Sequence, residues 1–349
     1  MLRRLYLGFV IAGCQWAPSA GAHHSYSEYD DKQTIEFEGK LIDVAWQNPH
    51  VRFTVEVKDK NDRVTLWDIE STSVNSLHRM QVPLDILTVG RSVKFAGWPS
   101  KRAGNRIYAT NLQASDGREV VLWRYSTPRW ATTALGVGSA EAAPRFQGGV
   151  ASDTDSLFRV WATDVTDVAS LAAWFGAPLA LTEASRKAVS EFNPVSDTTT
   201  PECTPKGMPM VMFQPPPMEF VDRGDTILLR TEEYDTVRTI HMTAQGNPEA
   251  QPKTHVGFSI GRWEGKTLVV ETGSVNARYL NARGVPLGAS ARFVERFTPT
   301  ADGSRLDYTL TITDPDSLTA PAEWKRYWVW RPGEQVLPFN CGERVTPDE

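Results

Sequence analysis

Cysteine is scarce in this chain, which has three among 349 residues: Cys14, Cys203 and Cys341. No two of them form a C-x-x-C pair, and this spacing argues against a redox motif or a thiolate metal site. Because disulfides persist in oxidising compartments, we expect Cys203 to pair with Cys341 if the chain is exported. Loop-entropy theory assigns such a long closure roughly 4 to 5 kcal/mol of stabilisation.

Strong positive charge and long apolar runs are also missing. The net charge of −5 and the pI near 5.8 give no electrostatic footprint for nucleic acid or an anionic membrane. No stretch beyond the first residues approaches the roughly 20 apolar residues of a membrane helix. We therefore expect no nucleic-acid partner and no transmembrane segment.

Several enzyme signatures are absent as well. The sequence contains no G-x-S-x-G, H-E-x-x-H, Walker loop or dinucleotide fingerprint. Their absence argues against the commonest hydrolases, metalloproteases and nucleotide-dependent enzymes. An enzyme of unfamiliar type stays open, although we lean against one.

The first residues have the three parts of a secretory signal peptide. Residues 1–4 carry two arginines, residues 5–13 are apolar, and residues 20–22 read Ala-Gly-Ala. Cleavage after residue 22 predicts a soluble protein of the bacterial periplasm, or a secreted one. An alternative is that the I-A-G-C run ending at Cys14 is a lipobox, which would give a lipid anchor at Cys14.

The alternation of apolar and polar residues predicts an all-β fold in two parts. Three strands, a helix and two strands is the order of an OB-like barrel. A further short strand follows it, and we place this domain at 23–125. The pattern predicts a hairpin over 34–57, a strand over 64–71, a helix over 73–80, and strands over 92–100, 106–114 and 118–125.

Residues 126–200 are rich in Gly, Ala, Ser and Pro, and this composition predicts a linker. The linker contains one helix at 181–194, whose start Thr182 can cap, and an additional strand signal at 156–165. About eight strand signals follow within 201–349. We expect these strands to form an antiparallel meander that closes into a lipocalin-like barrel, because closure removes exposed edges.

Three segments resemble the DUF6152 family of exported bacterial proteins: AHHSYSEYD at 22–30, GKLIDVAWQNPHV at 39–51 and VTLWDIESTSVNSL at 64–77. The resemblance covers about the first third of the chain, from His23 to Trp123. The second half, with CTPKGMPMVM at 203–212, is similar to uncharacterised periplasmic proteins found beside or fused to that domain. These resemblances imply an export location and a two-domain architecture, and no activity.

Two adjacent histidines would stand at the mature N-terminus. Cleavage after Ala22 makes His23 the first residue, so that its α-amine and imidazole can chelate a metal ion together. His24, or His50 in the hairpin after Trp46, would complete a nitrogen-only site that suits Cu(II). Cleavage one residue earlier leaves Ala-His-His, which also suits Cu(II) or Ni(II).

The alternative is that the paired histidines are ordinary polar residues of a terminus and that His50 only hydrogen-bonds within its turn. Glu70 is a candidate carboxylate ligand, although an exposed strand-end residue is the default. His78 is expected to face solvent.

The second half offers candidates for two other functions. His241 and His255 could act as general acid and base, and the alternative is that they are polar residues of a strand face. Phe258, Trp263 and Tyr327 could bind an apolar ligand inside the barrel, and the alternative is a filled core.

The leading hypothesis is therefore an exported binding protein. Its C-terminal barrel would hold a small apolar or amphipathic ligand, and its N-terminal histidines would bind copper. One alternative is an enzyme, a hydratase, isomerase or hydrolase that acts on a hydrophobic molecule through His241 and His255. Another alternative is a non-catalytic interaction module of the cell envelope.

Overall fold

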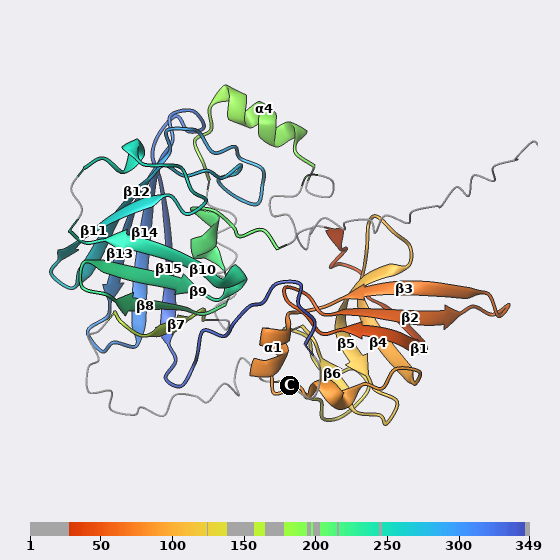
Figure 1. Ribbon diagram of the computed structural model, residues 1–349. Helices are drawn as coiled ribbons and strands as arrows, with labels where there is room; N and C mark the ends of the chain where they lie inside the picture. The colour runs from red at the N-terminus through yellow and green to blue at the C-terminus, as the bar shows by residue number, and fades with distance from the viewer. Residues whose placement is uncertain are drawn as a thin grey trace, which may run out of the picture.

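The described chain forms two β-barrels that lie side by side (Figure 1). The structure is a computed structural model. The predicted signal peptide at 1–22, with Cys14, and the two histidines His23 and His24 lie outside the described residues. The structure describes residues 28–123, 125–137, 157–164, 178–193, 197, 203–214, 216–243 and 246–345.

The N-terminal barrel has the topology predicted from the sequence. Its five strands follow the order β3-β2-β1-β4-β5, and a parallel pairing of β3 with β5 closes the ring. A helix lies between β3 and β4, as in an OB fold. The elements are β1 (Ile35–Ala45), β2 (Arg52–Lys58), β3 (Val64–Glu70), α1 (Val74–Arg79), η2 (Leu84–Ile86), β4 (Ser92–Pro99), β5 (Arg106–Gln113) and β6 (Glu119–Val121).

The short strand β6 extends the sheet beyond β5 and carries a buried carboxylate. Glu119 is 1% exposed and accepts hydrogen bonds from the backbone N–H groups of Arg129, Trp130 and Ala131 and from the Asn111 side chain. Burial raises the pKa of Glu119, but these donors outweigh burial and hold the pKa below the ordinary value of 4.5. Glu119 therefore anchors the loop at 129–131 as an anion.

The C-terminal barrel closes with nine strands. β15 pairs with β7, β7 with β8, and β9 with β10, so the ring has no free edge. The elements are β7 (Val160–Ala162), α4 (Glu183–Glu191), η3 (Met210–Phe213), β8 (Met218–Asp222), β9 (Thr226–Thr231), η4 (Glu233–Asp235), β10 (Thr236–His241), η5 (Pro248–Ala250), β11 (Phe258–Glu264), β12 (Thr267–Gly273), β13 (Arg292–Pro299), β14 (Arg305–Thr313) and β15 (Ala322–Trp330).

The predicted barrel and the predicted helix are confirmed, with two differences from a simple meander. Strand β7 comes from the stretch assigned to the linker and completes the C-terminal barrel. Strands β10 and β11 pair in parallel because residues 242–257 between them are long enough for a crossover. Helix α4 begins after Thr182, whose side chain accepts from the Ser185 N–H as a helix cap does.

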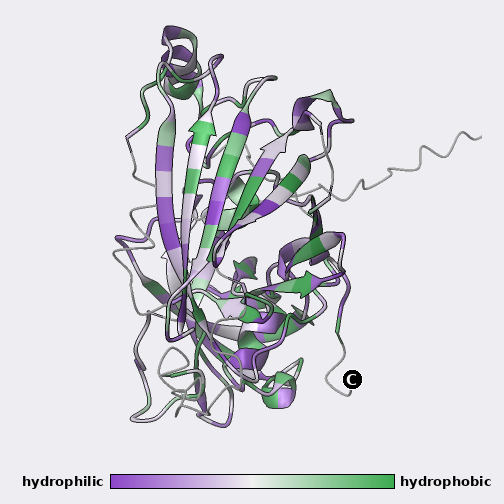
Figure 2. Cartoon of the chain, turned by 90° about the vertical axis from the view of Figure 1, so that its left-hand side faces the viewer, coloured by the Kyte–Doolittle hydropathy of each residue, from purple (hydrophilic) through white to green (hydrophobic). Residues whose placement is uncertain are grey.

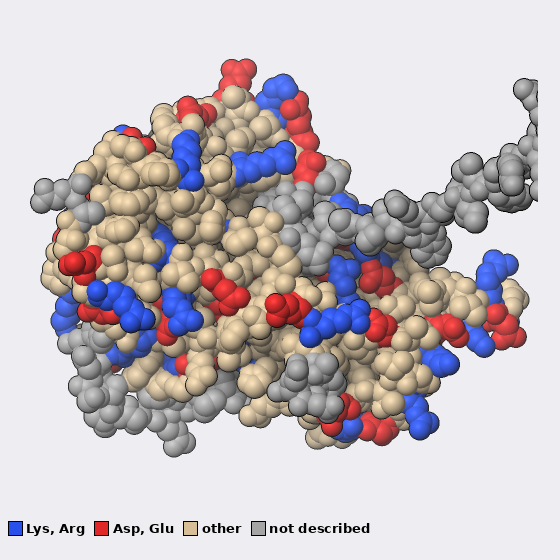
Figure 3. Space-filling view, viewed as in Figure 1, with Lys and Arg blue, Asp and Glu red and all other residues tan. Residues whose placement is uncertain are grey.

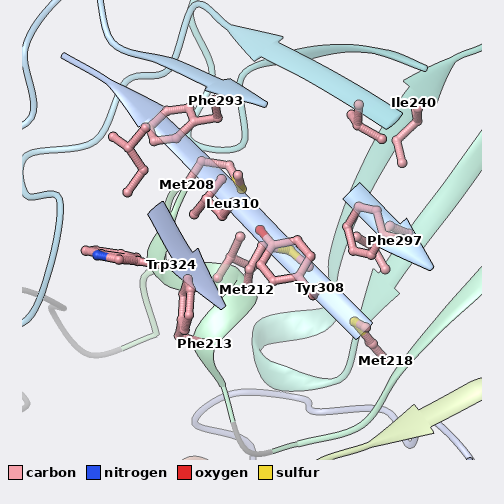
Figure 4. Packing of buried hydrophobic residues seen from close by; sticks show 14 of the residues in the cluster. Met208, Met212, Phe213, Met218, Ile240, Phe293, Phe297, Tyr308, Leu310 and Trp324 are labelled. Atoms are coloured by element: carbon pink, nitrogen blue, oxygen red, sulfur yellow. The ribbon is translucent and has the colours of Figure 1, made fainter. Parts of the chain in front are cut away.

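Alternation along the long strands separates the barrel interior from its surface, and Figure 2 shows the resulting hydrophobic and hydrophilic bands. The short helix η3 inserts its side chains among the inward residues of the strands. Met212 and Phe213 lie beside Tyr308 and Trp324 in this core (Figure 4). The chain thus packs its barrel with its own side chains.

A buried ion pair lies inside this core. Arg238 and Glu295 have side chains that are 2% and 0% exposed, and the guanidinium contacts both carboxylate oxygens. The Tyr308 hydroxyl donates to Glu295 at 2.9 Å, and Arg238 donates to Ser259 and Thr272 at 2.9 and 2.6 Å. Burial, and then the charge of Glu295, raise the pKa of Tyr308, which keeps its proton. The charges of Arg238 and Glu295 thus balance one another, and the hydroxyl groups of Tyr308, Ser259 and Thr272 complete their hydrogen bonds.

Charged side chains of one sign do not cluster on the surface that Figure 3 shows. Figure 3 shows basic and acidic side chains mixed over the visible face, where no area of one sign dominates. Among the described residues, no helix is long and apolar enough to cross a membrane.

Replacement of Glu295 by Gln should destabilise the protein by about 3 to 5 kcal/mol, because it leaves the buried Arg238 charge without its counter-ion. The control is Glu271→Gln, which breaks an ion pair with the exposed Arg262 and should cost about 0 to 1 kcal/mol. Urea denaturation of both variants measures the difference. Equal losses would contradict a structural role for the buried pair.

Replacement of Glu119 by Gln should lower the free energy of unfolding at pH 7 by about 1 to 3 kcal/mol, because three N–H groups lose a charged acceptor. The lowered pKa of Glu119 contributes stability above pH 4.5 that is lost as the pH falls through the folded-state pKa. The variant should therefore lose less stability than the wild type between pH 5 and pH 3. Urea midpoints across this range test it, and Glu191→Gln on the exposed face of α4 is the control.

Candidate functional site

A row of polar and aromatic side chains crosses the N-terminal barrel where β3 meets β5. The register places Arg52 opposite Glu70, Glu70 opposite Tyr108, and Tyr108 opposite Trp98. Residues opposite one another share a face of the sheet, and the next position, Ile69, points into the core. The row therefore lies on the outer face of the barrel, and we call it, together with Tyr29 and His50, the β3–β5 site.

His50 stands at this site just before β2. Its Nδ1 lies 2.7 Å from the Ser71 carbonyl oxygen and 3.4 Å from Glu70 Oε1, and the side chain is 20% exposed. A carbonyl oxygen only accepts, so Nδ1 carries a proton and donates it to Ser71. Metal-binding histidines are oriented in this way, by a carbonyl or carboxylate on the other ring nitrogen.

Tyr29 covers the site from the side of the N-terminus. Its hydroxyl donates to Glu70 Oε2 at 3.1 Å, and its ring lies 5.6 Å from the ring of Tyr108. Burial, followed by the charges of Glu70 and Glu28, raises the pKa of Tyr29, so the hydroxyl stays protonated and donates. The start of the described chain is thus fixed against Glu70.

Two arginines balance the carboxylates around the site. Arg52 lies 3.7 Å from both Glu70 and Asp68, and Arg106 pairs with Asp68 and Glu28. These ion pairs hold the carboxylates and the two guanidinium groups in a fixed arrangement.

Aromatic rings form the other wall. The ring of Trp98 stacks on Tyr108 at 5.7 Å and 20°, and Trp123 meets both rings edge-on at 5.3 and 5.8 Å. His50 lies edge-on to Tyr108 at 6.4 Å. These rings limit the access of water to the polar groups between them, which strengthens the electrostatic interactions of the site.

The sequence identified part of this site. His50 and Glu70 were candidates, and the structure places them together, but the expectation that Glu70 is exposed was wrong: the residue is 7% exposed. Glu70 is buried because β5 pairs alongside it and Tyr29 covers it. Tyr29 and Tyr108 were not recognised, although Tyr29 belongs to the AHHSYSEYD segment. His78 is exposed as expected.

The full set of proposed copper ligands cannot be assembled from the described part of the chain. His23 and His24 lie outside it, and within it no three His, Cys, Asp or Glu side chains are grouped to hold a metal ion. Copper binding at the N-terminus therefore stays a prediction.

The two histidines proposed as acid and base lie at the C-terminal barrel without orienting partners. The His241 ring stacks on Phe258 at 4.5 Å and 15°, and His255 is exposed in the turn before β11. Partial removal from water lowers the pKa of His255. Among the described residues, no carboxylate hydrogen-bonds to either imidazole. An acid–base pair oriented by a third group, as catalysis favours, is not present at these described side chains.

The three aromatic residues proposed to bind a ligand inside the barrel do not line its interior. Phe258 and Tyr327 alternate with Ser259 and Arg326, which point inward, so both rings lie on the outer face. Trp263 is the penultimate residue of β11 and is 45% exposed. Side chains alternate between the two faces of a strand. Once Ser259 and Arg326 are known to point inward, alternation places Phe258 and Tyr327 on the outer face.

The fold and site thus define a two-barrel protein with an OB-like first domain. The family model of DUF6152, a family of unknown function, matches residues 12–109 of the chain. The resemblance seen in the N-terminal motifs is confirmed over this part, which includes His50 and Glu70. A comparison with curated proteins finds no match.

Replacement of Tyr29 by Phe should lower the free energy of unfolding by about 1 to 2 kcal/mol, because the charged Glu70 loses a hydrogen-bond donor in a buried setting. The control is Tyr279→Phe at a half-buried ring, where the change should stay within about 0.5 kcal/mol. Thermal or urea unfolding measures both. A neutral Tyr29→Phe would contradict the role given to this contact.

Proposed function

We propose that this chain is an exported periplasmic binding protein whose N-terminal barrel holds Cu(II) at the β3–β5 site. His50 is the ligand among the described residues, and His23 and His24 supply the other nitrogens after cleavage behind Ala22. The observation that carries the proposal is the contact of His50 Nδ1 with the Ser71 carbonyl oxygen, which orients the imidazole in the way that metal-binding histidines are oriented.

The length of the chain supports this assignment. Tyr29 is buried at the site, and His23 precedes it by six residues. Six residues of extended chain span up to roughly 20 Å. Tyr29 contacts Glu70, and Glu70 contacts His50, so a segment of this length is long enough for the two N-terminal histidines to reach His50.

The chemistry of the donors also supports copper. An α-amine and imidazoles are the nitrogen donors that Cu(II) prefers, and Irving–Williams stability is highest for this ion. Glu70 faces the protonated nitrogen of His50, where a carboxylate increases the basicity of the ligand. The described residues fit an orienting shell around one imidazole ligand.

The C-terminal barrel is a weaker candidate for the binding function. Its inward side chains form one continuous cluster, and the polar groups of Arg238 and Glu295 are satisfied by one another. A small apolar or amphipathic ligand in this barrel stays a prediction, as do the enzyme and the interaction module. We therefore place the binding function on the N-terminal barrel.

Titration of the mature chain, starting at His23, with Cu(II) should give one tight site per molecule by calorimetry and a nitrogen-rich signal by electron paramagnetic resonance. His50→Gln should weaken Cu(II) binding at least tenfold, because the amide can replace the hydrogen bond to Ser71 but not the imidazole ligand. Glu70→Gln should weaken it about tenfold through the lost orienting partner.

The matched control is His78→Gln, because His78 is exposed on α1. This variant should bind Cu(II) with the same affinity as the wild type. Circular dichroism establishes that each variant is folded. Unchanged affinity in a folded His50→Gln variant, or a wild type that takes up no Cu(II), would overturn the proposal.

A further inference from the structure

The last described residues form a strap that connects the two barrels. This C-terminal strap, residues 334–345, follows β15 and crosses from the C-terminal barrel to the neighbourhood of α1, in dark blue in Figure 1. Arg79 at the end of α1 contacts Glu334 of the strap and Glu232 of the C-terminal barrel. The strap thus lies between the barrels and touches both.

The first half of the strap is held by the C-terminal barrel. The Leu337 N–H donates to Glu232 at 2.9 Å. The N–H groups of Phe339 and Asn340 donate to Asp235 at 2.8 and 3.1 Å. These carboxylates belong to the segment around η4, so this half is anchored on the C-terminal barrel as well as contacted by Arg79, Asn75 and Asn48 of the N-terminal barrel.

The second half is held by the N-terminal barrel. The Gly342 N–H donates to the Asn48 carbonyl at 2.9 Å, and the Val345 N–H donates to the Trp46 carbonyl at 2.8 Å. The Asn48 side chain, 5% exposed, donates to the Phe339 carbonyl at 2.6 Å. Trp46 and Asn48 are the first and third residues of the W-x-N-P-H run that ends at His50, so this run binds the strap.

The disulfide lies where the strap passes from one barrel to the other. Cys341 pairs with Cys203, as expected from the sequence, and forms an isolated backbone bridge with Asn48. Cys203 is exposed and Cys341 is half-buried, so a reductant can approach the Cys203 sulfur. The covalent bond therefore fixes the point from which the second half extends.

The contacts beyond Cys341 are few. They include the backbone hydrogen bonds from Gly342 and Val345, packing of the half-buried Val345 against the N-terminal core, a turn bond from the Glu343 N–H to the Asn340 carbonyl, and an ion pair of Arg344 with Asp43, whose side chains are 60% and 47% exposed. Exposed ion pairs contribute little to stability. The covalent bond at Cys341 therefore supplements a small set of non-covalent contacts on this half of the strap.

We propose that the Cys203–Cys341 disulfide is a redox-controlled latch that holds the strap on the Asn48 loop and thereby couples the two barrels. An external dithiol reduces it: one thiolate attacks the Cys203 sulfur, the sulfur–sulfur bond breaks, and Cys341 leaves as a thiolate that takes up a proton. The second thiol of the dithiol then displaces Cys203 as a thiol, and the dithiol becomes a disulfide.

Reduction releases the strap beyond Cys341 and removes the partners of the Trp46 and Asn48 carbonyls. The Asn48 loop, two residues before His50, then keeps its side-chain contact with Asn75 but loses these two backbone contacts. The latch does not depend on metal binding at His50, because its contacts lie on the strap and the loop alone.

The test is amide hydrogen exchange by NMR on the full chain, oxidised and after reduction with dithiothreitol, with thiol labelling and mass measurement to show complete reduction. The Gly342 and Val345 amides should exchange at least tenfold faster in the reduced protein. The Leu337 amide, held by Glu232, and the amides of β12 to β14 should keep their rates.

Cys203→Ser is the matched variant, and it should reproduce the exchange pattern of the reduced protein without a reductant. If this variant does not fold, the comparison of the oxidised and reduced wild type decides. Unchanged exchange at Gly342 and Val345 after complete reduction would overturn the latch. Equal acceleration in β12 to β14 would also overturn it, because the disulfide would then be a brace for the whole fold.

Discussion

The parallel pairing of β3 with β5 is the contact on which the candidate site depends. It closes the N-terminal barrel and sets Glu70 beside Tyr108. The adjacent antiparallel pairing of β2 with β3 then brings Arg52 to the other side of Glu70. Without this closure, Glu70 would end an exposed strand, and His50 would lack the carboxylate that faces its ring.

The two barrels handle buried charge in different ways. In the C-terminal barrel, Arg238 and Glu295 neutralise one another within the packed interior, and this pair is costly to disturb. In the N-terminal barrel, the charged groups lie on the outer face among aromatic rings, where the OB fold presents its ligand-binding surface. This contrast favours the first barrel as the functional one.

Local patterns were sufficient to predict most of the fold. Alternation and turn residues gave the OB-like order and the closed C-terminal barrel, and Thr182 marked the start of α4. The burial of Glu70 could not be predicted, because it depends on a pairing between strands that are far apart in the sequence. The inward position of Glu295 could have been predicted from the sequence, because Glu295 alternates in phase with the core residues Phe293 and Phe297.

The central claim is that the mature chain begins at the paired histidines and holds copper there with His50. The most direct measurement is the intact mass of the protein purified from the native envelope without added metal or chelator, in native and denaturing spectra of one sample. A chain starting at His23, with one copper ion that is lost on denaturation, is the predicted result. A chain starting at a lipidated Cys14, or one starting at His23 without copper, would contradict the account.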